Sequence, residues 1–406
     1  MPNWRRNLIV CWFGMFMSSI GMSQIAPVLP LYINHLGIHN VSLIAQFSGF
    51  AFGATFIISA VFSPIWGSAA DKYGRKPMLL RASLGMGIII GCMGFVQNVY
   101  ELIGLRLLLG VIAGYGSACT ALIATQTDKE HAGYALGTLS TASTAGSLIG
   151  PMIGGYLEEI TGLQNIFFIT GALLVISFIA TALFVKESFD RQDKKVLPIK
   201  EIWRQIPEKS LIITLFVTFF VLTLALYSIE PIITVYITQL TKNSNHVALL
   251  AGITFSAAGL ASVIAAPRLG KLSDQYGAHK VILVALIVAG LVFLPQAFVT
   301  HTWQLMSLRF ILGLATAGLM PSINTLLKKI TPDVLTGRVF GITMSAGYLG
   351  VFAGSTLGGQ IAANFGIRSV FIFTGAILLI NAVWVYYKVL LKINLKENST
   401  VETLNG

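Results

Sequence analysis

The chain has 406 residues, of which 55% are hydrophobic and only 11% are charged, and its mean hydropathy is +0.78. A soluble domain carries about 25% charged residues, so the composition excludes an ordinary soluble protein and indicates an integral membrane protein. The formal net charge of +11 would also suit a nucleic-acid-binding protein. The distribution of the charges, described below, argues against nucleic acid as a partner.

Twelve apolar runs dominate the sequence. A membrane-spanning helix needs about 20 mostly apolar residues, and no alternating pattern of a membrane barrel is present. The first run is too long for a signal-peptide core, so we expect it to be retained as a span. The twelve predicted spans are 8–33, 44–66, 78–96, 100–125, 132–156, 167–185, 211–239, 248–267, 281–299, 302–327, 339–362 and 370–391.

A single long polar segment, 186–210, separates the sixth run from the seventh and contains seven cations and five acids. We therefore expect an N-terminal six-helix bundle at 1–185, a cytoplasmic linker at 186–210, and a C-terminal six-helix bundle at 211–406 with a short cytoplasmic tail. A short amphipathic helix is expected near 199–206.

Lysine and arginine positions predict the orientation. With the N-terminus inside, 23 of the 27 Lys and Arg residues fall in inside segments, and only Lys242 and Arg368 fall outside. Because cytoplasmic loops are enriched in Lys and Arg, both termini are predicted to be cytoplasmic. We expect a multi-pass protein of the plasma membrane, which in a bacterium is the inner membrane. The lipid bilayer, and not nucleic acid, is then the partner of this basic surface.

The two halves of the chain repeat each other. Residues 67–76 read Gly-Ser-Ala-Ala-Asp-Lys-Tyr-Gly-Arg-Lys, and Gly67, Asp71, Tyr73 and Gly74 recur 203 positions later at Gly270, Asp274, Tyr276 and Gly277. Arg106 and Arg309 have the same spacing. A fixed shift of half the chain indicates an internal duplication. The predicted fold is all-α, with twelve transmembrane helices in two pseudo-symmetric bundles, an architecture typical of alternating access.

The segment 67–76 is predicted to form the turn between spans 2 and 3. Gly67 would permit close approach of helices, and Gly74 would adopt a positive φ in a tight turn. Asp71 could accept hydrogen bonds from the N-terminus of a neighbouring helix, whose dipole favours an anion. Arg75 and Lys76 add cations, and Arg75 could lock the same contact. An ordinary cytoplasmic loop that obeys the charge rule is the alternative.

A second motif in span 5 is rich in small residues. Glycines spaced four apart let membrane helices pack closely, and a proline kinks or loosens a helix. The residues are Gly146, Gly150, Pro151, Gly154 and Gly155, and the repeat has Ser355 in place of Pro151. Ordinary helix packing and gating both remain open for this motif.

Three charged residues lie well inside the predicted spans, away from their ends: Arg106, Arg309 and Glu230. Charges are costly in lipid, so they should face a cavity or a partner, and their similar depths would allow Glu230 to pair with either arginine. Glu230 is matched by Ala26 in the first half, so the repeat does not explain it. It could handle a proton or a cation, or form a static pair with an arginine.

These motifs resemble the signature motifs of the major facilitator superfamily: 67–76, Arg106 in Leu-Arg-Leu-Leu-Leu-Gly, and Gly146 to Gly155. The last resembles the antiporter motif of the twelve-span drug:proton antiporters. The phrases at 5–10, 135–140 and 266–272 resemble MdtG-type multidrug efflux proteins. The acid at Glu230 departs from the pattern expected of that group.

The resemblance implies that Asp71 meets span 11, and that spans 1, 4, 7 and 10 line a central cavity. Aromatic and methionine side chains on spans 1 and 7 would then contact amphipathic ligands. Those side chains are Met15, Phe16, Met22, Phe220 and Tyr227. The resemblance also implies a monomer without cofactor or metal, energised by the proton gradient, with small amphipathic molecules and protons as partners.

Three functions are compatible with the sequence. Proton-coupled efflux of amphipathic drugs agrees best with the motifs. Proton-coupled transport of another solute, such as a sugar or a metabolite, is the alternative, although few polar side chains lie within the spans. An intramembrane enzyme or receptor is the third, but the sequence shows no His-Glu-x-x-His, Gly-x-Ser-x-Gly or nucleotide-binding P-loop pattern.

Overall fold

The computed structural model describes residues 3–189, 209–241, 246–331 and 333–390, and these are helical apart from short connections. The described residues include no strand, so the predicted all-α fold is confirmed. Most of the predicted linker, 186–210, and the amphipathic helix expected near 199–206 lie outside the described residues.

The first half of the chain contains eight helices. They are α1 (Asn3–Ser23), α2 (Ile25–His35), α3 (Val41–Tyr73), α4 (Arg75–Met93), α5 (Val99–Ile112), α6 (Tyr115–Gln126), α7 (Lys129–Thr161) and α8 (Leu163–Phe184). The second half repeats this order. Its elements are α10 (Lys209–Ile229), η1 (Glu230–Ile232), α11 (Ile233–Thr241), α12 (Val247–Tyr276), α13 (Ala278–Gln296), α14 (Thr302–Thr316), α15 (Leu319–Ile330), α16 (Asp333–Phe365), α17 (Ile367–Val385) and η2 (Tyr386–Leu390).

Each predicted apolar run corresponds to one helix or to a broken pair of helices. Within the described residues, ten helical segments are long and apolar enough to span a membrane, and three of them are the pairs α5–α6, α10–α11 and α14–α15. The pair α1–α2, bent by 44°, makes an eleventh. Helix α7 has 33 residues and is also long enough, but its Gly, Ser and Thr residues make it less apolar. The expected twelve-helix architecture therefore agrees with the structure.

The first, fourth, seventh and tenth spans are each interrupted near their middle or in their last third along the chain. Between α5 and α6, Gly114 has a φ of 124°, a conformation that side chains disfavour. Between α10 and α11, Pro231 lacks the N–H that would bond the carbonyl of Tyr227, and the chain forms the short 3₁₀ turn η1. Interrupted helices of this kind place backbone polar groups inside the bundle.

The duplication is visible in the hydrogen bonds. In each half, a tyrosine hydroxyl on the first span bonds a backbone carbonyl at the end of the third span, and a serine on the second span bonds a carbonyl on the fourth. The equivalent pairs are Tyr32 to Met93 (2.6 Å) and Tyr236 to Gln296 (3.1 Å), then Ser59 to Gly110 (3.3 Å) and Ser262 to Gly313 (3.0 Å). Corresponding residues are 203 or 204 positions apart, so the two bundles share one internal plan.

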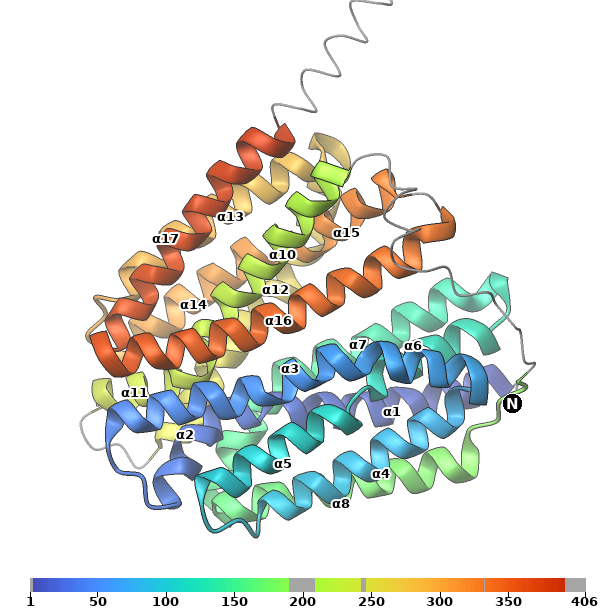
Figure 1. Ribbon diagram of the computed structural model, residues 1–406, viewed down its shortest axis with the longest axis horizontal. Helices are drawn as coiled ribbons and strands as arrows, with labels where there is room; N and C mark the ends of the chain where they lie inside the picture. Colours follow the sequence, from blue (N-terminus) through green and yellow to red (C-terminus); the bar gives the residue numbers. More distant parts are fainter. Residues whose placement is uncertain (1–2, 190–208, 242–245, 332, 391–406) are drawn as a thin grey trace, which may run out of the picture.

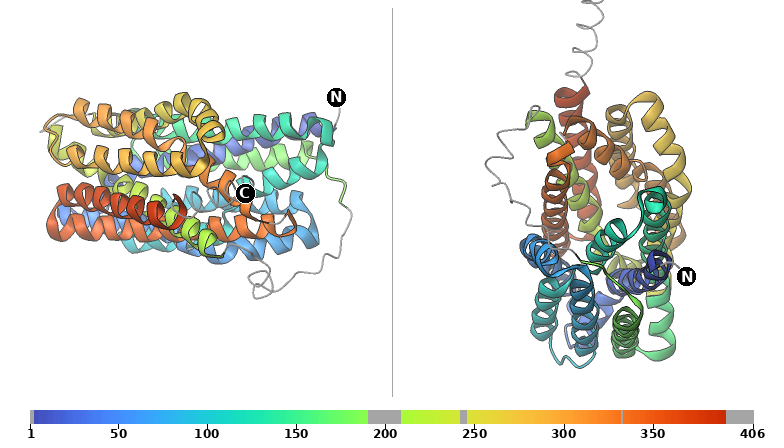
Figure 2. Two further views of the ribbon diagram at one scale, coloured as in Figure 1. Left: turned by 90° about the horizontal axis from the view of Figure 1, so that it is seen from above. Right: turned by 90° about the vertical axis from the view of Figure 1, so that its right-hand side faces the viewer.

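The two halves meet at one end of the molecule and diverge toward the other. Figure 1 shows α1–α8 below and α10–α17 above, close together at the left and separated at the right. The end-on view in Figure 2 shows the two groups of helices one above the other. We call the right-hand end of Figure 1, where α1 begins and α3 ends, the basic end.

At the opposite end, contacts cross directly between the halves. Thr234 donates a hydrogen bond of 2.9 Å to the carbonyl of Pro27, and Ser256 donates one of 2.6 Å to the carbonyl of Leu148. Nearer the surface, Nδ1 of His246 lies 2.9 Å from a carboxylate oxygen of Glu159. This end is therefore closed by polar contacts as well as by packing.

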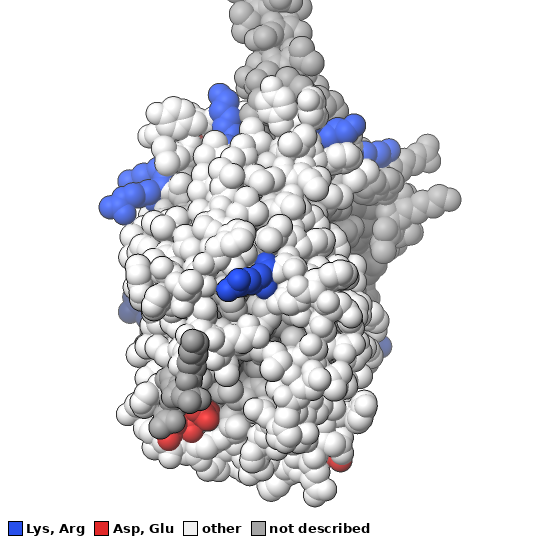
Figure 3. All heavy atoms as spheres, turned by 90° about the vertical axis from the view of Figure 1, so that its left-hand side faces the viewer, with Lys and Arg blue, Asp and Glu red and all other residues white. Residues whose placement is uncertain are grey.

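Charged side chains are distributed unevenly along the molecule. Figure 3 shows the face opposite the basic end, where uncharged side chains prevail among the described atoms. Large apolar side chains are exposed along the helices, as in Ile88 (54%), Val284 (59%) and Ile380 (68%). Exposed apolar surface of this extent is typical of contact with lipid. The described Lys and Arg residues of the basic end include Arg5, Arg6, Lys72, Arg75, Lys76, Lys186, Lys209, Arg268, Lys271, Lys280, Lys328, Lys329 and Lys388.

Candidate functional site

A central cavity of about 540 Å³ lies between the two halves. It is lined on one side by residues from α1, α2, α3, α4, α6, α7 and the connection between α5 and α6, and on the other by residues from α10, η1, α12, α14 and α16. A cavity of this size accommodates a drug-sized ligand. Of the residues predicted from the sequence, Met15, Met22 and Tyr227 line it, whereas Phe16 and Phe220 are not among the lining residues. Phe16 instead stacks on Trp12, with ring centres 5.2 Å apart.

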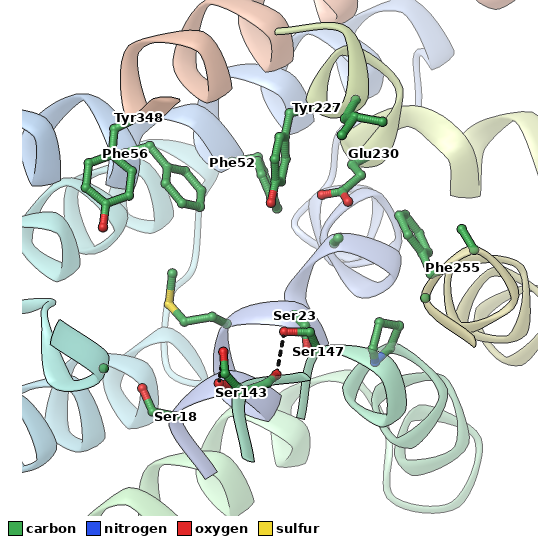
Figure 4. Close-up of a pocket in the computed structure, with 18 of the residues that line it drawn as sticks. Ser18, Ser23, Phe52, Phe56, Ser143, Ser147, Tyr227, Glu230, Phe255 and Tyr348 are labelled. Atoms are coloured by element: carbon green, nitrogen blue, oxygen red, sulfur yellow. Dashed lines mark hydrogen bonds between the residues drawn. The ribbon is translucent and has the colours of Figure 1, made fainter. Parts of the chain in front are cut away.

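One wall of the cavity is aromatic and is built by both halves. The ring of Tyr227 lies 6.0 Å from Phe52 and 6.2 Å from Phe56, and Phe56 lies 6.2 Å from Tyr348. Figure 4 shows these four rings along one side of the cavity. Phe52 and Phe56 come from α3, while Tyr227 and Tyr348 come from α10 and α16. A flat apolar ligand could therefore contact both halves at once.

The facing wall carries hydroxyl groups. Ser18 and Ser23 of α1 and Ser143 and Ser147 of α7 line the cavity across from the aromatic rings (Figure 4). Ser23 donates a hydrogen bond of 3.1 Å to the carbonyl of Gly146, and Ser147 donates one of 2.8 Å to the carbonyl of Ser143. Each oxygen retains lone pairs for a further donor, so this wall offers hydrogen-bond acceptors to a ligand.

Glu230 occupies the interruption of the seventh span. It begins η1, directly before Pro231, and is only partly exposed. Figure 4 shows its carboxylate directed into the cavity beside Tyr227, and Glu230 is among the lining residues. It makes no hydrogen bond or salt bridge to any described residue. The cavity thus contains a carboxylate that is accessible to a ligand or a proton.

The two intramembrane arginines differ in spite of the repeat. Arg106 is 1% exposed and donates hydrogen bonds to the α3 carbonyls of Ala51 (2.9 Å) and Phe52 (3.0 Å). It is absent from the cavity lining, so the structure does not bring it to Glu230. Arg309 is 5% exposed, lines the cavity, and interacts electrostatically with Glu230.

The cavity continues toward the basic end as a vestibule of about 290 Å³. The two spaces share a set of lining residues: Ser59, Ala113, Gly114, Ser117 and Tyr348. The vestibule reaches the end of α3, where Gly67, Asp71 and Arg75 line it. Apart from its own helix, no described atom lies within 4 Å of the position that a Cβ of Gly67 would take.

The turn between α3 and α4 is held by charged groups. Arg75 Nη2 lies 2.7 Å from an oxygen of Asp71, which is 71% exposed, and Gly74 has a φ of 94°. Glu187, directly after α8, accepts the backbone N–H groups of Arg75 (2.8 Å) and Lys76 (2.7 Å). The expected contact between Asp71 and the start of span 11 involves side chains at 332–338, which lie outside the described part of the chain.

The glycine motif of α7 forms two close contacts. Added Cβ atoms at Gly146, Gly150 and Gly154 would each lie within 2.8 Å of an atom of α1 or of Gln24, which follows it. An added Cβ at Gly155 would lie 2.3 Å from the carbonyl oxygen of Ala248 in α12. One face of α7 therefore packs against helix α1 of its own half, and the adjacent face packs against helix α12 of the other half.

The Major Facilitator Superfamily sequence family matches residues 11–249 and 231–403 of this chain. The chain belongs to the major facilitator superfamily. It is 42% identical to the multidrug resistance protein MdtG of Escherichia fergusonii over 383 residues, which are 94% of each chain. It is 41% identical to MdtG of Salmonella arizonae, with coverage of 94% of this chain and 95% of that one.

Solved structures of other transporters share the fold. A bacterial homologue of the human lysosomal transporter Spinster, in an inward-facing and unoccupied conformation, has a TM-score of 0.80, with 14% identity and coverage of 96% of this chain and 97% of that one. The human organic anion transporter MFSD10 has a TM-score of 0.69, with 16% identity and coverage of 95% and 100%. The family match and the MdtG relatives indicate a multi-pass membrane transporter.

Several cavity residues were not found from the sequence. Phe52, Phe56 and Tyr348 lie on spans 2 and 11, whereas the resemblance directed attention to spans 1 and 7. Glu187 was counted only among the charges of the linker.

Among the described residues, no cluster of three or more His, Cys, Asp or Glu side chains could hold a metal ion.

Proposed function

We propose that this protein is a secondary active transporter that exports amphipathic drugs by alternating access, coupled to the proton gradient. The observation that carries the proposal is the central cavity, which reaches the basic end through the vestibule while polar contacts close the opposite end. A site between two repeats, open to one side at a time, is what alternating access requires. The MdtG relatives support drugs as the substrate class.

We place the basic end in the cytoplasm of a bacterium, with the protein in the inner membrane and both termini inside. The excess of Lys and Arg at this end supports that orientation. The cavity is then open inward, where an exporter collects its substrate. We expect the transporter to act as a monomer and to need no cofactor, because each chain contains a complete cavity.

Glu230 is our candidate for coupling. A carboxylate inside a membrane protein is costly when it is charged and unpaired, and the cost disappears when it binds a proton or a cation. Its position at the interruption before Pro231 places it where the seventh span can change shape. Export of a cationic drug and uptake of a proton would then compete for one carboxylate.

The hydroxyl wall favours a second candidate function. Serines of α1 and α7 on one face of the cavity could hydrogen-bond a polar solute such as a sugar or a metabolite. The sequence alone indicated few polar groups in the spans, so the structure strengthens this alternative. The aromatic wall opposite argues for amphipathic compounds, which would use both faces.

The decisive experiment is a flux assay with purified protein in liposomes. An imposed pH gradient should drive accumulation of amphipathic cations against their concentration gradient, and dissipation of the gradient should stop it. A panel of neutral, cationic and anionic amphipaths together with sugars separates the two candidates. Gradient-driven transport restricted to sugars or metabolites would exclude drug efflux as the function.

A further inference from the structure

Arg309 lacks the interactions that satisfy its repeat partner. Arg106 bonds the carbonyls of Ala51 and Phe52, and the equivalent carbonyls in the second half belong to Thr254 and Phe255. Arg309 makes no hydrogen bond to these or to any other described residue, and its Nε and Nη2 are buried without a partner. Nearly all buried polar groups of proteins are hydrogen-bonded, so this arginine requires an explanation.

A static pair with Glu230 is not that explanation. Both side chains line the same cavity, and their charges interact. No oxygen of Glu230 lies within 4.0 Å of a nitrogen of Arg309, so the two side chains form no salt bridge. The cavity therefore presents a carboxylate and a guanidinium that are near one another but not joined.

Two separated, unpaired charges in one low-dielectric cavity favour a particular occupant. A cation alone would satisfy Glu230 and leave Arg309 buried without a partner, and an anion alone would do the reverse. A ligand that carries both charges satisfies both groups, and leaving either one unpaired is strongly unfavourable. The guanidinium, with a planar set of donors, is suited to a carboxylate or a phosphonate.

We propose that the preferred substrates of this cavity are zwitterionic aromatic compounds, with the cationic group at Glu230, the anionic group at Arg309 and the ring against Phe52, Phe56, Tyr227 and Tyr348. This inference rests on the proposed transport function and specifies its substrate class. The aromatic wall adjoins Glu230 in Figure 4, so one molecule can reach the rings and the carboxylate together. Arg309 is then a specificity-determining residue.

A matched set of ligands on one scaffold tests the proposal. Naphthylalanine is a zwitterion, its amide is a cation, its N-acetyl derivative is an anion, and the N-acetyl amide is neutral. Binding of each to the purified full-length transporter would be measured by calorimetry at pH 7, for the wild type, Glu230→Gln and Arg309→Gln. The wild type should bind the zwitterion at least about tenfold more tightly than the other three ligands.

The two variants serve as controls for each other. Glu230→Gln should weaken the zwitterion and the cation at least about tenfold without weakening the anion, whereas Arg309→Gln should weaken the zwitterion and the anion without weakening the cation. Retained binding of one charged ligand shows that each variant is folded. Arg309→Lys should restore part of the affinity for the zwitterion, because it keeps the charge but loses the planar donor set.

Equal wild-type affinities for the four ligands, failure to bind the zwitterion, or insensitivity of the zwitterion to Arg309→Gln would overturn the proposal. The flux assay separates this failure from failure of the proposed function. If the pH gradient still drives export of neutral or cationic amphipaths, the transport function stands and only the zwitterion preference is lost.

Discussion

Gly155 of α7 lies directly against the backbone of Ala248 of α12, so a single methyl group at Gly155 would come within 2.3 Å of a carbonyl oxygen of the other half. The repeat contains the same contact. An added Cβ at Gly359 of α16 would lie 2.6 Å from the carbonyl oxygen of Ala45 in α3. These two contacts hold the halves together at the end opposite the vestibule.

We expect Gly155→Ala to destabilise the closed outer end. Overpacking against backbone atoms costs about 1–3 kcal/mol, so the equilibrium should shift roughly tenfold toward the outward-open state. Distances between spin labels on the outer ends of α7 and α12 would measure the shift. Gly137→Ala is the matched control, because no described atom lies within 4 Å of an added Cβ there. Equal distance distributions for the two variants would contradict the packing argument.

We expect Asp71→Asn to slow transport several-fold without lowering the amount of folded protein in the membrane. The substitution removes the charge that Arg75 contacts at 2.7 Å, at the end of the vestibule where the halves must meet when the cavity closes inward. Initial transport rates, normalised to protein amount, provide the measurement. Asp274→Asn is the control, because Ala278 replaces the arginine in the second copy. If Asp71→Asn is abundant and fully active, the motif does not act as a latch.

We expect Glu187→Gln to destabilise the first half by about 1–2 kcal/mol. Its carboxylate accepts two N–H groups at the start of α4, where the helix dipole favours an anion, and an amide provides only one acceptor oxygen. Thermal unfolding in detergent should show a lower Tm. Glu130→Gln is a matched control in the first turn of α7, where the glutamate is exposed and makes no hydrogen bond to a described residue. An unchanged Tm for Glu187→Gln would exclude this stabilising role.

We expect Glu230→Gln to abolish or uncouple transport of cationic substrates, while neutral substrates still move. Glutamine keeps the size and hydrogen-bonding capacity of the side chain but cannot take part in proton exchange. Parallel flux measurements with a cation and a neutral amphipath, with and without a pH gradient, would show the difference. Transport of the cation at the wild-type rate, with the same dependence on the gradient, would make Glu230 a structural residue and direct the search for coupling to Asp71.

Hydropathy and the repeat predicted most of the fold, because both can be identified from the sequence without knowing how the helices pack. The shift of 203 or 204 residues correctly related Tyr32 to Tyr236 and Arg106 to Arg309. It could not predict that one arginine bonds its neighbouring helix while the other faces the cavity. That difference depends on how helices of the two halves pack, and similar residues in similar places can pack differently.

The cavity was predicted only in part for a related reason. Met15, Met22 and Tyr227 lie on the helices that the resemblance indicated, and they line the cavity. Phe52 and Tyr348 lie on α3 and α16, which line the cavity because these two helices run side by side where the two halves meet (Figure 1). A hydropathy pattern does not reveal this arrangement, because the lipid-facing and cavity-facing sides of these helices are both apolar.

The glycine contacts of Gly155 and Gly359 also constrain how the transporter moves. In both, the backbone of one half rests on the backbone of the other without an intervening side chain that could change rotamer. Because no side chains separate the two backbones, sliding at these contacts would bring main-chain atoms into steric clash. The halves must instead separate at both contacts together, by rotation as rigid bodies. A substitution that disrupts either contact should therefore destabilise closure of the whole end opposite the vestibule.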